Sequence, residues 1–129
     1  MRTHKKGYEI SFDKTRNFLK LRVSGFWDVE LGKKFEREFQ EKIKEVHASG
    51  NGWHLLVDLT RSPPQSPEIQ DIVGRAMLSA KQAGMKKKAI LANWSIIVFQ
   101  TANFLQEPEL QVDFYFQSED DAIRWLLNA

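Results

Sequence analysis

The sequence has 129 residues, which is enough for one domain with a substantial hydrophobic core. Its 19 basic and 17 acidic residues leave a net charge of +2, a balance that gives no support for nucleic-acid binding. The lack of cysteine excludes disulfides, thiol catalysis and thiolate metal sites. No stretch of the sequence is apolar enough for a membrane span, and residues 1–7 lack the apolar core of a signal peptide, so we expect a cytoplasmic protein.

Residues 1–7 are polar, and we expect them to form a disordered tail ahead of a single domain spanning residues 8–129. After this tail, apolar residues alternate with polar ones over residues 8–12 and again over residues 19–23, which predicts a hairpin with one solvated face. Asp28 is suited to cap a helix that we expect to run to about Ser49. Five apolar residues of this helix would form one buried stripe: Leu31, Phe35, Phe39, Ile43 and Val46.

The centre of the chain predicts a strand, a loop and a helix in succession. Residues 53–60 form an apolar run of strand length, and the prolines at 63 and 64 end it. Ser66, Pro67 and Glu68 then supply a side-chain cap, a proline suited to the first turn and a carboxylate at the positive end of a helix. Gly84 is placed to terminate that helix.

The remaining residues predict two more strands, each followed by a helix. The strands cover residues 89–92 and 112–116, the first helix runs from Asn93 to about Gln106, and Ser118 caps the last helix. Strands that are separated by helices pair in parallel through right-handed crossovers. The sequence therefore predicts an α/β domain with a largely parallel sheet.

Four segments resemble the bacterial SpoIIAA-like, or STAS/SEC14-like, domain family in their order and spacing. The resemblance implies a five-stranded mixed sheet with an antiparallel first strand and about four helices, in the order β-β-α-β-α-β-α-β-α. It implies little biochemistry, because most stand-alone domains of this kind lack an assigned activity. The relatives that are better understood are anti-sigma-factor antagonists, which bind a partner kinase and are switched by serine phosphorylation, and lipid-carrying SEC14 domains. The segments are Val23-Ser24-Gly25-Phe26-Trp27, Leu55-Leu56-Val57-Asp58-Leu59, Gly84-Met85-Lys86-Lys87-Lys88-Ala89 and Phe116-Gln117-Ser118-Glu119-Asp120-Asp121-Ala122-Ile123-Arg124-Trp125-Leu126.

Ser66 is the nearest positional match to the regulatory serine of the antagonists, which begins the helix after the central strand. The family's Asp-Ser-Ser-Gly-like motif is absent here, and Pro67 removes a backbone donor that a phosphate would use. Ser66 is thus a plain helix cap or a phosphorylation switch, and the sequence favours the cap.

Ligand sites of parallel sheets lie at the carboxyl ends of the strands. Side chains predicted there could grip a small ligand or a peptide, although each also has a structural role available as a cap or a core residue. Asp58, for example, ends a strand where backbone donors of the adjoining loop could satisfy it. The predicted rim consists of Trp27, Asp58, Arg61, Ser62, Ser66, Asn93 and Trp94.

The sequence contains no catalytic constellation. The three histidines, at positions 4, 47 and 54, lie away from the predicted rim, and there is no glycine-rich phosphate loop or nucleophile elbow. We therefore expect neither an enzyme nor a bound metal or cofactor.

Apolar surface is the remaining functional signal. Leu56 and Leu91 point towards the second face of the sheet, and Ile96, Phe99 and Phe104 lie off the inward stripe of the helix that contains them. A helix crossing to that face, a homodimer contact or a lipid-lined pocket could each cover them. Two hypotheses follow: a non-enzymatic regulatory or protein-interaction module that self-associates, or a domain that binds a lipid or another small apolar ligand.

Overall fold

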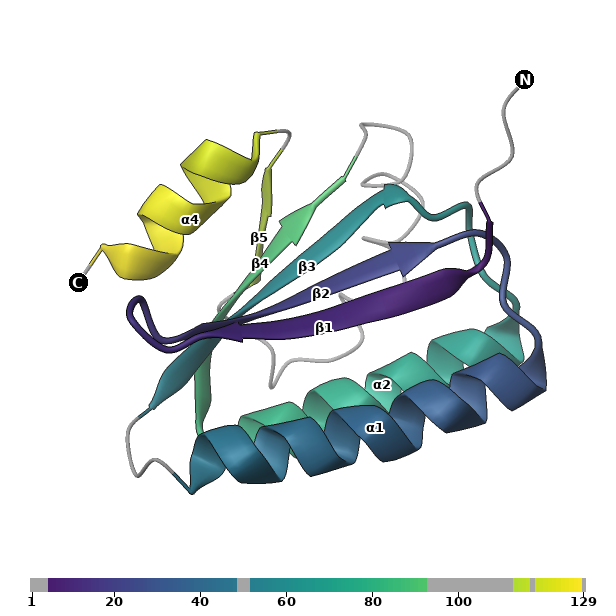
Figure 1. Ribbon diagram of the computed structural model, residues 1–129. Coiled ribbons are helices and arrows are strands. Elements are labelled where there is room, and N and C mark those ends of the chain that lie inside the picture. The colour runs from purple at the N-terminus through teal and green to yellow at the C-terminus, as the bar shows by residue number, and fades with distance from the viewer. Residues whose placement is uncertain (1–4, 49–51, 93–112, 117, 129) are drawn as a thin grey trace.

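We describe the protein from a computed structural model, which defines residues 5–48, 52–92, 113–116 and 118–128. Within these ranges the chain folds into one sheet with helices on both of its faces (Figure 1). None of the helices described is long and apolar enough to cross a membrane. The strands are β1 (Gly7–Asp13), β2 (Phe18–Ser24), β3 (Trp53–Arg61), β4 (Met85–Leu91) and β5 (Asp113–Phe116), and the helices are α1 (Val29–His47), α2 (Pro67–Gln82) and α4 (Glu119–Leu127).

The sheet has the strand order β1-β2-β3-β4-β5. β1 and β2 form the expected antiparallel hairpin, with Ile10 opposite Leu21, and the other three pairs are parallel. This arrangement is the mixed sheet that the sequence predicted. Asn17, with a φ of 59°, turns the chain between β1 and β2.

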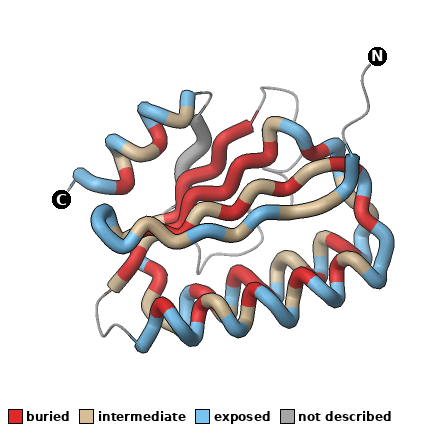
Figure 2. The backbone as a smooth tube through the Cα atoms, in the orientation of Figure 1, coloured by how far each residue is buried: buried red, intermediate tan, exposed pale blue. Residues whose placement is uncertain are grey.

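The main core lies between the sheet and the helices α1 and α2. The predicted α1 stripe is buried there at Phe35, Phe39, Ile43 and Val46, with Leu31 packed at its border. Figure 2 shows the buried positions of α1 and α2 facing the sheet and the exposed positions facing solvent. The larger of the two described cores therefore lies between these two helices and the sheet.

The opposite face of the sheet carries a smaller core. Leu56 and Leu91 point to this face as expected, and Ala122 and Leu126 of α4 cover them. Lys87 donates a hydrogen bond to the backbone oxygen of Trp125 at 3.2 Å and lies over the ring of Trp125. The simplest of the three predicted alternatives, a helix crossing to this face, is therefore the one observed for Leu56 and Leu91.

Two expectations differ from the structure or lie outside it. The expected disordered tail extends to Gly7, but Gly7 is the first residue of β1, and Lys6 forms an ion pair with Asp28. Gly7 also accepts a hydrogen bond from the Trp27 indole at 3.2 Å, so both Lys6 and Gly7 contact the rest of the domain. The helix expected from Asn93 to about Gln106 falls outside the described residues.

Candidate functional site at the carboxyl ends of the strands

Two loops meet at the carboxyl ends of β2 and β3. The backbone N–H of Gly25 donates to the carbonyl of Arg61 at 3.0 Å, and Ser24 lies opposite Arg61 in the sheet. Gly25 has a φ of 69°, a left-handed conformation that glycine adopts without strain. The chain can therefore leave β2, turn across the end of β3 and enter α1.

Gln65 joins these two loops through both ends of its side-chain amide. Its Oε1 accepts a hydrogen bond from the backbone N–H of Trp27 at 2.9 Å, and its Nε2 donates to the carbonyl of Gly25 at 2.7 Å. Nε2 also lies 3.0 Å from the hydroxyl of Ser62. We call Gln65 with the backbone of Gly25 and Trp27 the loop clamp. The sequence analysis missed it, because a glutamine beside prolines carries no distinctive pattern.

Three residues of the predicted rim lie inside the protein: Trp27, Ser62 and Asp58. Trp27 is 1% exposed and its ring packs at 5.2 Å from the ring of Phe35, while its indole N–H donates to the carbonyls of Gly7 and Ser24. Ser62 is 2% exposed and donates to the carbonyl of Pro63 at 2.9 Å. The side chains of Trp27 and Ser62 therefore position the loops from the interior of the protein.

The outward surface of the same loops carries different residues. Phe26 is 58% exposed, Val29 is also exposed, and Arg61 is exposed where β3 ends. We call these three residues the carboxyl-edge surface. Phe26 belongs to a segment that the sequence analysis noted, but its exposure was not predicted. The burial alternation of β2 continues beyond the strand, with Val23, Gly25 and Trp27 buried and Phe26 exposed, so period-two spacing was the signal that could have found it.

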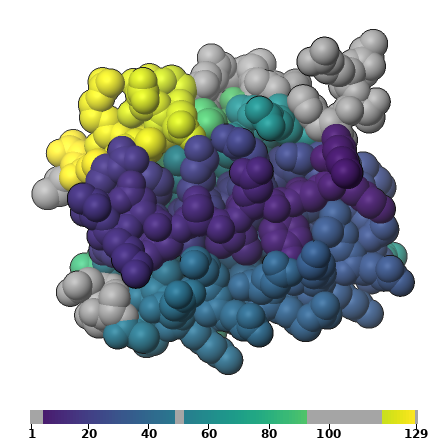
Figure 3. Space-filling view, in the orientation of Figure 1, coloured from purple at the N-terminus to yellow at the C-terminus, as the bar shows by residue number. Residues whose placement is uncertain are grey.

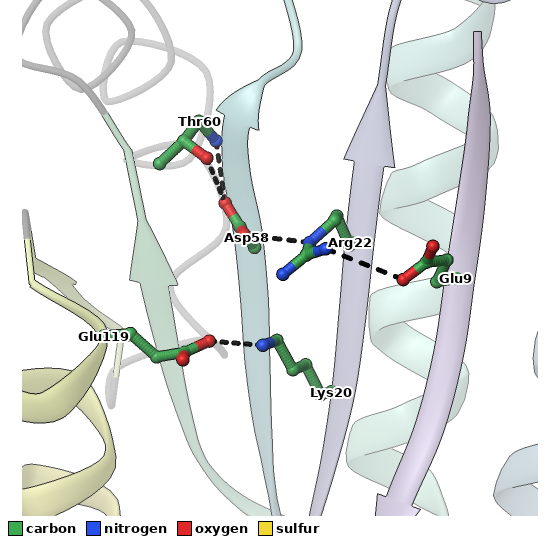
Figure 4. A network of polar contacts seen from close by, with 6 residues as sticks. All are labelled: Glu9, Lys20, Arg22, Asp58, Thr60 and Glu119. Carbon is green, nitrogen blue, oxygen red and sulfur yellow. Dashed lines mark hydrogen bonds and ion pairs between the residues drawn. The ribbon is translucent and has the colours of Figure 1, made fainter. Parts of the chain in front are cut away.

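Asp58 is buried in a polar network on the face of the sheet that α4 partly covers (Figure 4). Its Oδ1 accepts hydrogen bonds from the backbone N–H and the hydroxyl of Thr60, at 2.9 and 2.6 Å. Its Oδ2 lies 3.2 Å from Nε of Arg22 on β2, and Arg22 also approaches Glu9 of β1 at 3.7 Å. The donors differ from the predicted ones, because β3 continues to Arg61 and Thr60 is a residue of the strand itself and not of the adjoining loop. Arg22, at a strand position that the sequence predicted to be solvated, is a further partner of Asp58.

A second ion pair extends the network towards α4. Lys20 of β2 pairs with Glu119 in the first turn of α4. Figure 4 shows Lys20 and Arg22 projecting from the same strand towards acidic partners on different elements. Each cation in this network has a carboxylate partner, so the arrangement joins the sheet to α4 and leaves little unneutralised charge for an anionic ligand.

Ser66 caps α2. Its Oγ accepts a hydrogen bond from the backbone N–H of Ile69 at 3.3 Å, and Pro67 occupies the first turn, as the sequence predicted for a cap. The side chain is half-buried, and the carbonyl of the neighbouring Gln65 accepts a hydrogen bond from Gln70 at 2.8 Å. Asn93 and Trp94, the other two rim residues, lie outside the described residues.

The titratable group nearest the site, Asp28, has a structural role as a helix cap. A hydrogen bond from Lys6 and another from the backbone of Leu31 lower the pKa of Asp28, so this cap stays ionised. Among the described residues, no group of three His, Cys, Asp or Glu side chains could hold a metal ion. In the part of the chain described, the site contains no paired acid and base and no activated nucleophile.

Comparison with solved structures identifies the fold. The chain superposes on an uncharacterised protein of the DUF3478 family with a SpoIIAA-like fold from Shewanella loihica PV-4, with a TM-score of 0.70 and 15% identity over 98% of this chain and 97% of that one. It also matches an anti-sigma factor antagonist from Mycobacterium paratuberculosis, with a TM-score of 0.58 and 13% identity over 98% of this chain and 100% of that one.

The chain therefore has a SpoIIAA-like, or STAS-type, fold, as the sequence predicted. No protein-family model matches the sequence, and no curated protein matches it. At these levels of identity the likeness to solved structures establishes the fold and leaves the role open.

Proposed function

We propose that this protein is a non-enzymatic regulatory module that binds another protein through the carboxyl-edge surface of Phe26, Val29 and Arg61. The observation that carries the proposal is the exposure of Phe26 on a loop that the clamp holds at both flanking residues. The likeness to an antagonist of an anti-sigma factor supports a regulatory role, because that protein shares the fold over its whole length.

A fixed, exposed aromatic ring favours binding for two reasons. Burying a phenylalanine ring removes a large apolar surface from water, and aromatic residues carry much of the binding energy at protein interfaces. The clamp also restrains the backbone of Gly25 and Trp27 before any partner arrives. Binding at Phe26 therefore loses less conformational entropy than binding at a loose loop would.

The charges near this surface indicate the chemistry of the partner. An open hollow beside Asp28, at the start of α1, is lined by more basic than acidic side chains. Together with the charge of Arg61, it favours a partner segment in which an apolar residue is flanked by carboxylates. The charged residues that line the hollow are Lys6, Lys33, Lys34 and Arg37 against Asp28 and Glu30.

The test is a binding measurement on matched exposed residues. Partners would be captured from a lysate of the source organism, identified by mass spectrometry, and purified for titration calorimetry against the wild-type protein and two variants. Phe26→Ser should weaken the binary complex by about 10-fold or more, which is the effect of removing an interface hot spot. Leu127→Ser, which removes an exposed apolar side chain at the end of α4, should leave the affinity unchanged.

Equal affinities for wild type and Phe26→Ser would place the partner elsewhere on the molecule. Loss of binding in both variants would instead indicate non-specific adhesion of apolar surface. Because Phe26 is exposed, thermal unfolding of the variant should match the wild type, which separates a binding defect from a folding defect.

The lipid-binding alternative rests on Ile96, Phe99 and Phe104, which lie outside the described residues. In the part of the chain that is described, the apolar residues of the second face, Leu56 and Leu91, pack against α4. No observation therefore favours a lipid site over a protein-binding surface.

A further inference from the structure

β1 forms one edge of the sheet and lacks several features that usually protect an edge strand, although Glu9 and Asp13 are charged. Among the described strands it is hydrogen-bonded to β2 alone. It has seven residues, pairs with β2 without a bulge, and contains neither proline nor lysine. Natural edge strands are commonly protected by a short length, a bulge, a proline or a lysine. Without them, the outward N–H and C=O groups of the strand can pair with another strand. Figure 3 shows β1 on the near surface of the molecule, beside α1.

The inward row of β1 is also incompletely buried. Tyr8, Ile10 and Phe12 are only partly buried, although they pack against the main core. The matching row of β2, for example Leu21 opposite Ile10, is buried completely. An added strand beside β1 would continue the sheet and cover this row.

From these features we propose that β1 pairs in antiparallel register with β1 of a second copy of this chain, about a two-fold axis at Ile10. In this register Tyr8 lies opposite Phe12 of the second copy, and Glu9 lies opposite Ser11. Directly opposed residues of an antiparallel pair point to the same face, so both apolar rows lie on the helix-covered side. The two sheets would join into one of ten strands, twice the five of one chain.

The charges of β1 select this register and favour a second copy as the occupant. An axis at Glu9 would place two Glu9 carboxylates opposite each other. An axis at Ser11 would place Glu9 opposite Asp13 twice. Like charges that are directly opposed destabilise a strand pair, and only the axis at Ile10 avoids acid–acid contacts while pairing five or more residues of each strand. The strand is thus self-complementary in one register.

Ser11 provides the test, because a negative charge at this position is compatible with the fold of one chain but would destabilise the pairing of two chains. Within the chain Ser11 is exposed and lies opposite Lys20 of β2, so a glutamate is compatible with the fold. Between two chains the same glutamate would face Glu9 twice by symmetry. We would compare Ser11→Glu, Ser11→Gln and Ser11→Lys, which differ in charge and little in length, by sedimentation equilibrium from micromolar to millimolar protein.

We expect the wild type to dimerise in this range. Ser11→Glu should raise the dimer dissociation constant about 10-fold relative to Ser11→Gln, because two pairs repel at once, and Ser11→Lys should lower it. Salt should compress these differences. Hydrogen exchange of the β1 amides should slow as the concentration of the wild type rises, and circular dichroism should confirm that all variants are folded.

Three results would overturn the proposal. One is a wild type that stays monomeric throughout the range. Another is a dimer whose dissociation constant is the same for Ser11→Glu and Ser11→Gln, which would move the interface to a different surface. The third is a monomer whose β1 is protected by an extended segment of an unrelated protein. None of these readouts involves Phe26, so this proposal and the proposed function fail separately.

Discussion

The face of the sheet that α1 and α2 cover is filled by aromatic and aliphatic side chains, whereas the face that α4 covers joins a small apolar cluster to a polar network. Trp27, Phe35 and Phe39 stack in sequence on the first face, with ring centroids 5.2 and 5.3 Å apart. On the second face, Leu56 and Leu91 meet α4, and Lys20, Arg22 and Asp58 lie nearby. Apolar burial dominates the first face, whereas the second face combines a smaller apolar cluster with paired charges.

The largest difference between the two faces should be in the free energy of unfolding that is lost when a buried side chain is truncated. Phe35 is fully buried and its ring contacts those of Tyr8, Trp27 and Phe39. Phe35→Ala should lower the free energy of unfolding by about 3–5 kcal/mol, because it removes apolar burial and leaves a cavity. Leu126→Ala on α4 should cost less, about 2 kcal/mol. Urea unfolding of both variants measures this, and equal losses would remove the contrast between the faces.

The polar network should respond more weakly. Asp58→Asn keeps the shape of the side chain but removes the charge that faces Nε of Arg22 at 3.2 Å. We expect a loss of about 1–3 kcal/mol in the free energy of unfolding, moderated because Arg22 remains partly exposed to solvent. Glu9→Gln, at the exposed end of the same network, should cost less than about 0.5 kcal/mol. A comparable loss in both would mean that burial of Asp58 does not matter.

The apolar pattern of the sequence was enough to predict the first face. The hairpin, the α1 stripe that includes Phe35 and Ile43, and the start of α2 at Ser66 follow from period-two and period-3.6 spacing and from cap chemistry. These are local properties, since each residue's role depends on neighbours within a few positions. The antiparallel first strand came from the family resemblance as well, and the structure shows it.

The polar network and the loop clamp could not be predicted in this way. Arg22 occupies a strand position that reads as solvated, and only the parallel pairing of β2 with β3 brings it to Asp58. Gln65 meets Gly25 and Trp27 across about 40 residues of chain, and no spacing rule connects them. Such contacts depend on tertiary placement, which propensity and periodicity do not encode.

The helix caps offer a finer comparison of the two faces. Ser66 caps α2 and Ser118 caps α4, with Ser118 Oγ accepting from Asp121 N–H at 3.4 Å. Each serine-to-alanine change should cost about 1 kcal/mol of helix stability. We expect Ser66→Ala to lower global stability in urea unfolding, because α2 covers the main core. Ser118→Ala should mainly speed hydrogen exchange within α4, because fewer apolar contacts hold that helix.

Ser66→Asp is the control for this comparison, since aspartate also caps helices. It should restore the stability that Ser66→Ala loses. If Ser66→Asp were as unstable as Ser66→Ala, the hydrogen bond from Ile69 would not be what the serine contributes. Equal global losses for Ser66→Ala and Ser118→Ala would show that α4 unfolds only together with the rest of the domain.

The smallest expected effect is a pH dependence on the second face. Burial, and then the charges of Lys87 and Lys86, lower the pKa of His54 below its ordinary value of 6.5. The folded protein therefore favours neutral His54. The resulting contribution to the free energy of unfolding is complete above pH 6.5 and is lost as the pH falls through 6.5 towards the lowered pKa. His54→Gln should flatten the fall in stability between about pH 7.5 and 5.5, above the range in which most carboxylates titrate.

The change should amount to a fraction of a kcal/mol, because His54 is only partly buried and solvent screens its interaction with the lysines. His47→Gln is the matched control, since His47 is exposed at the end of α1. Urea unfolding of both variants across this pH range measures the effect. If His54→Gln left the slope intact while His47→Gln flattened it, His54 would not be the group responsible. The claim that charge affects stability on the second face would then fail.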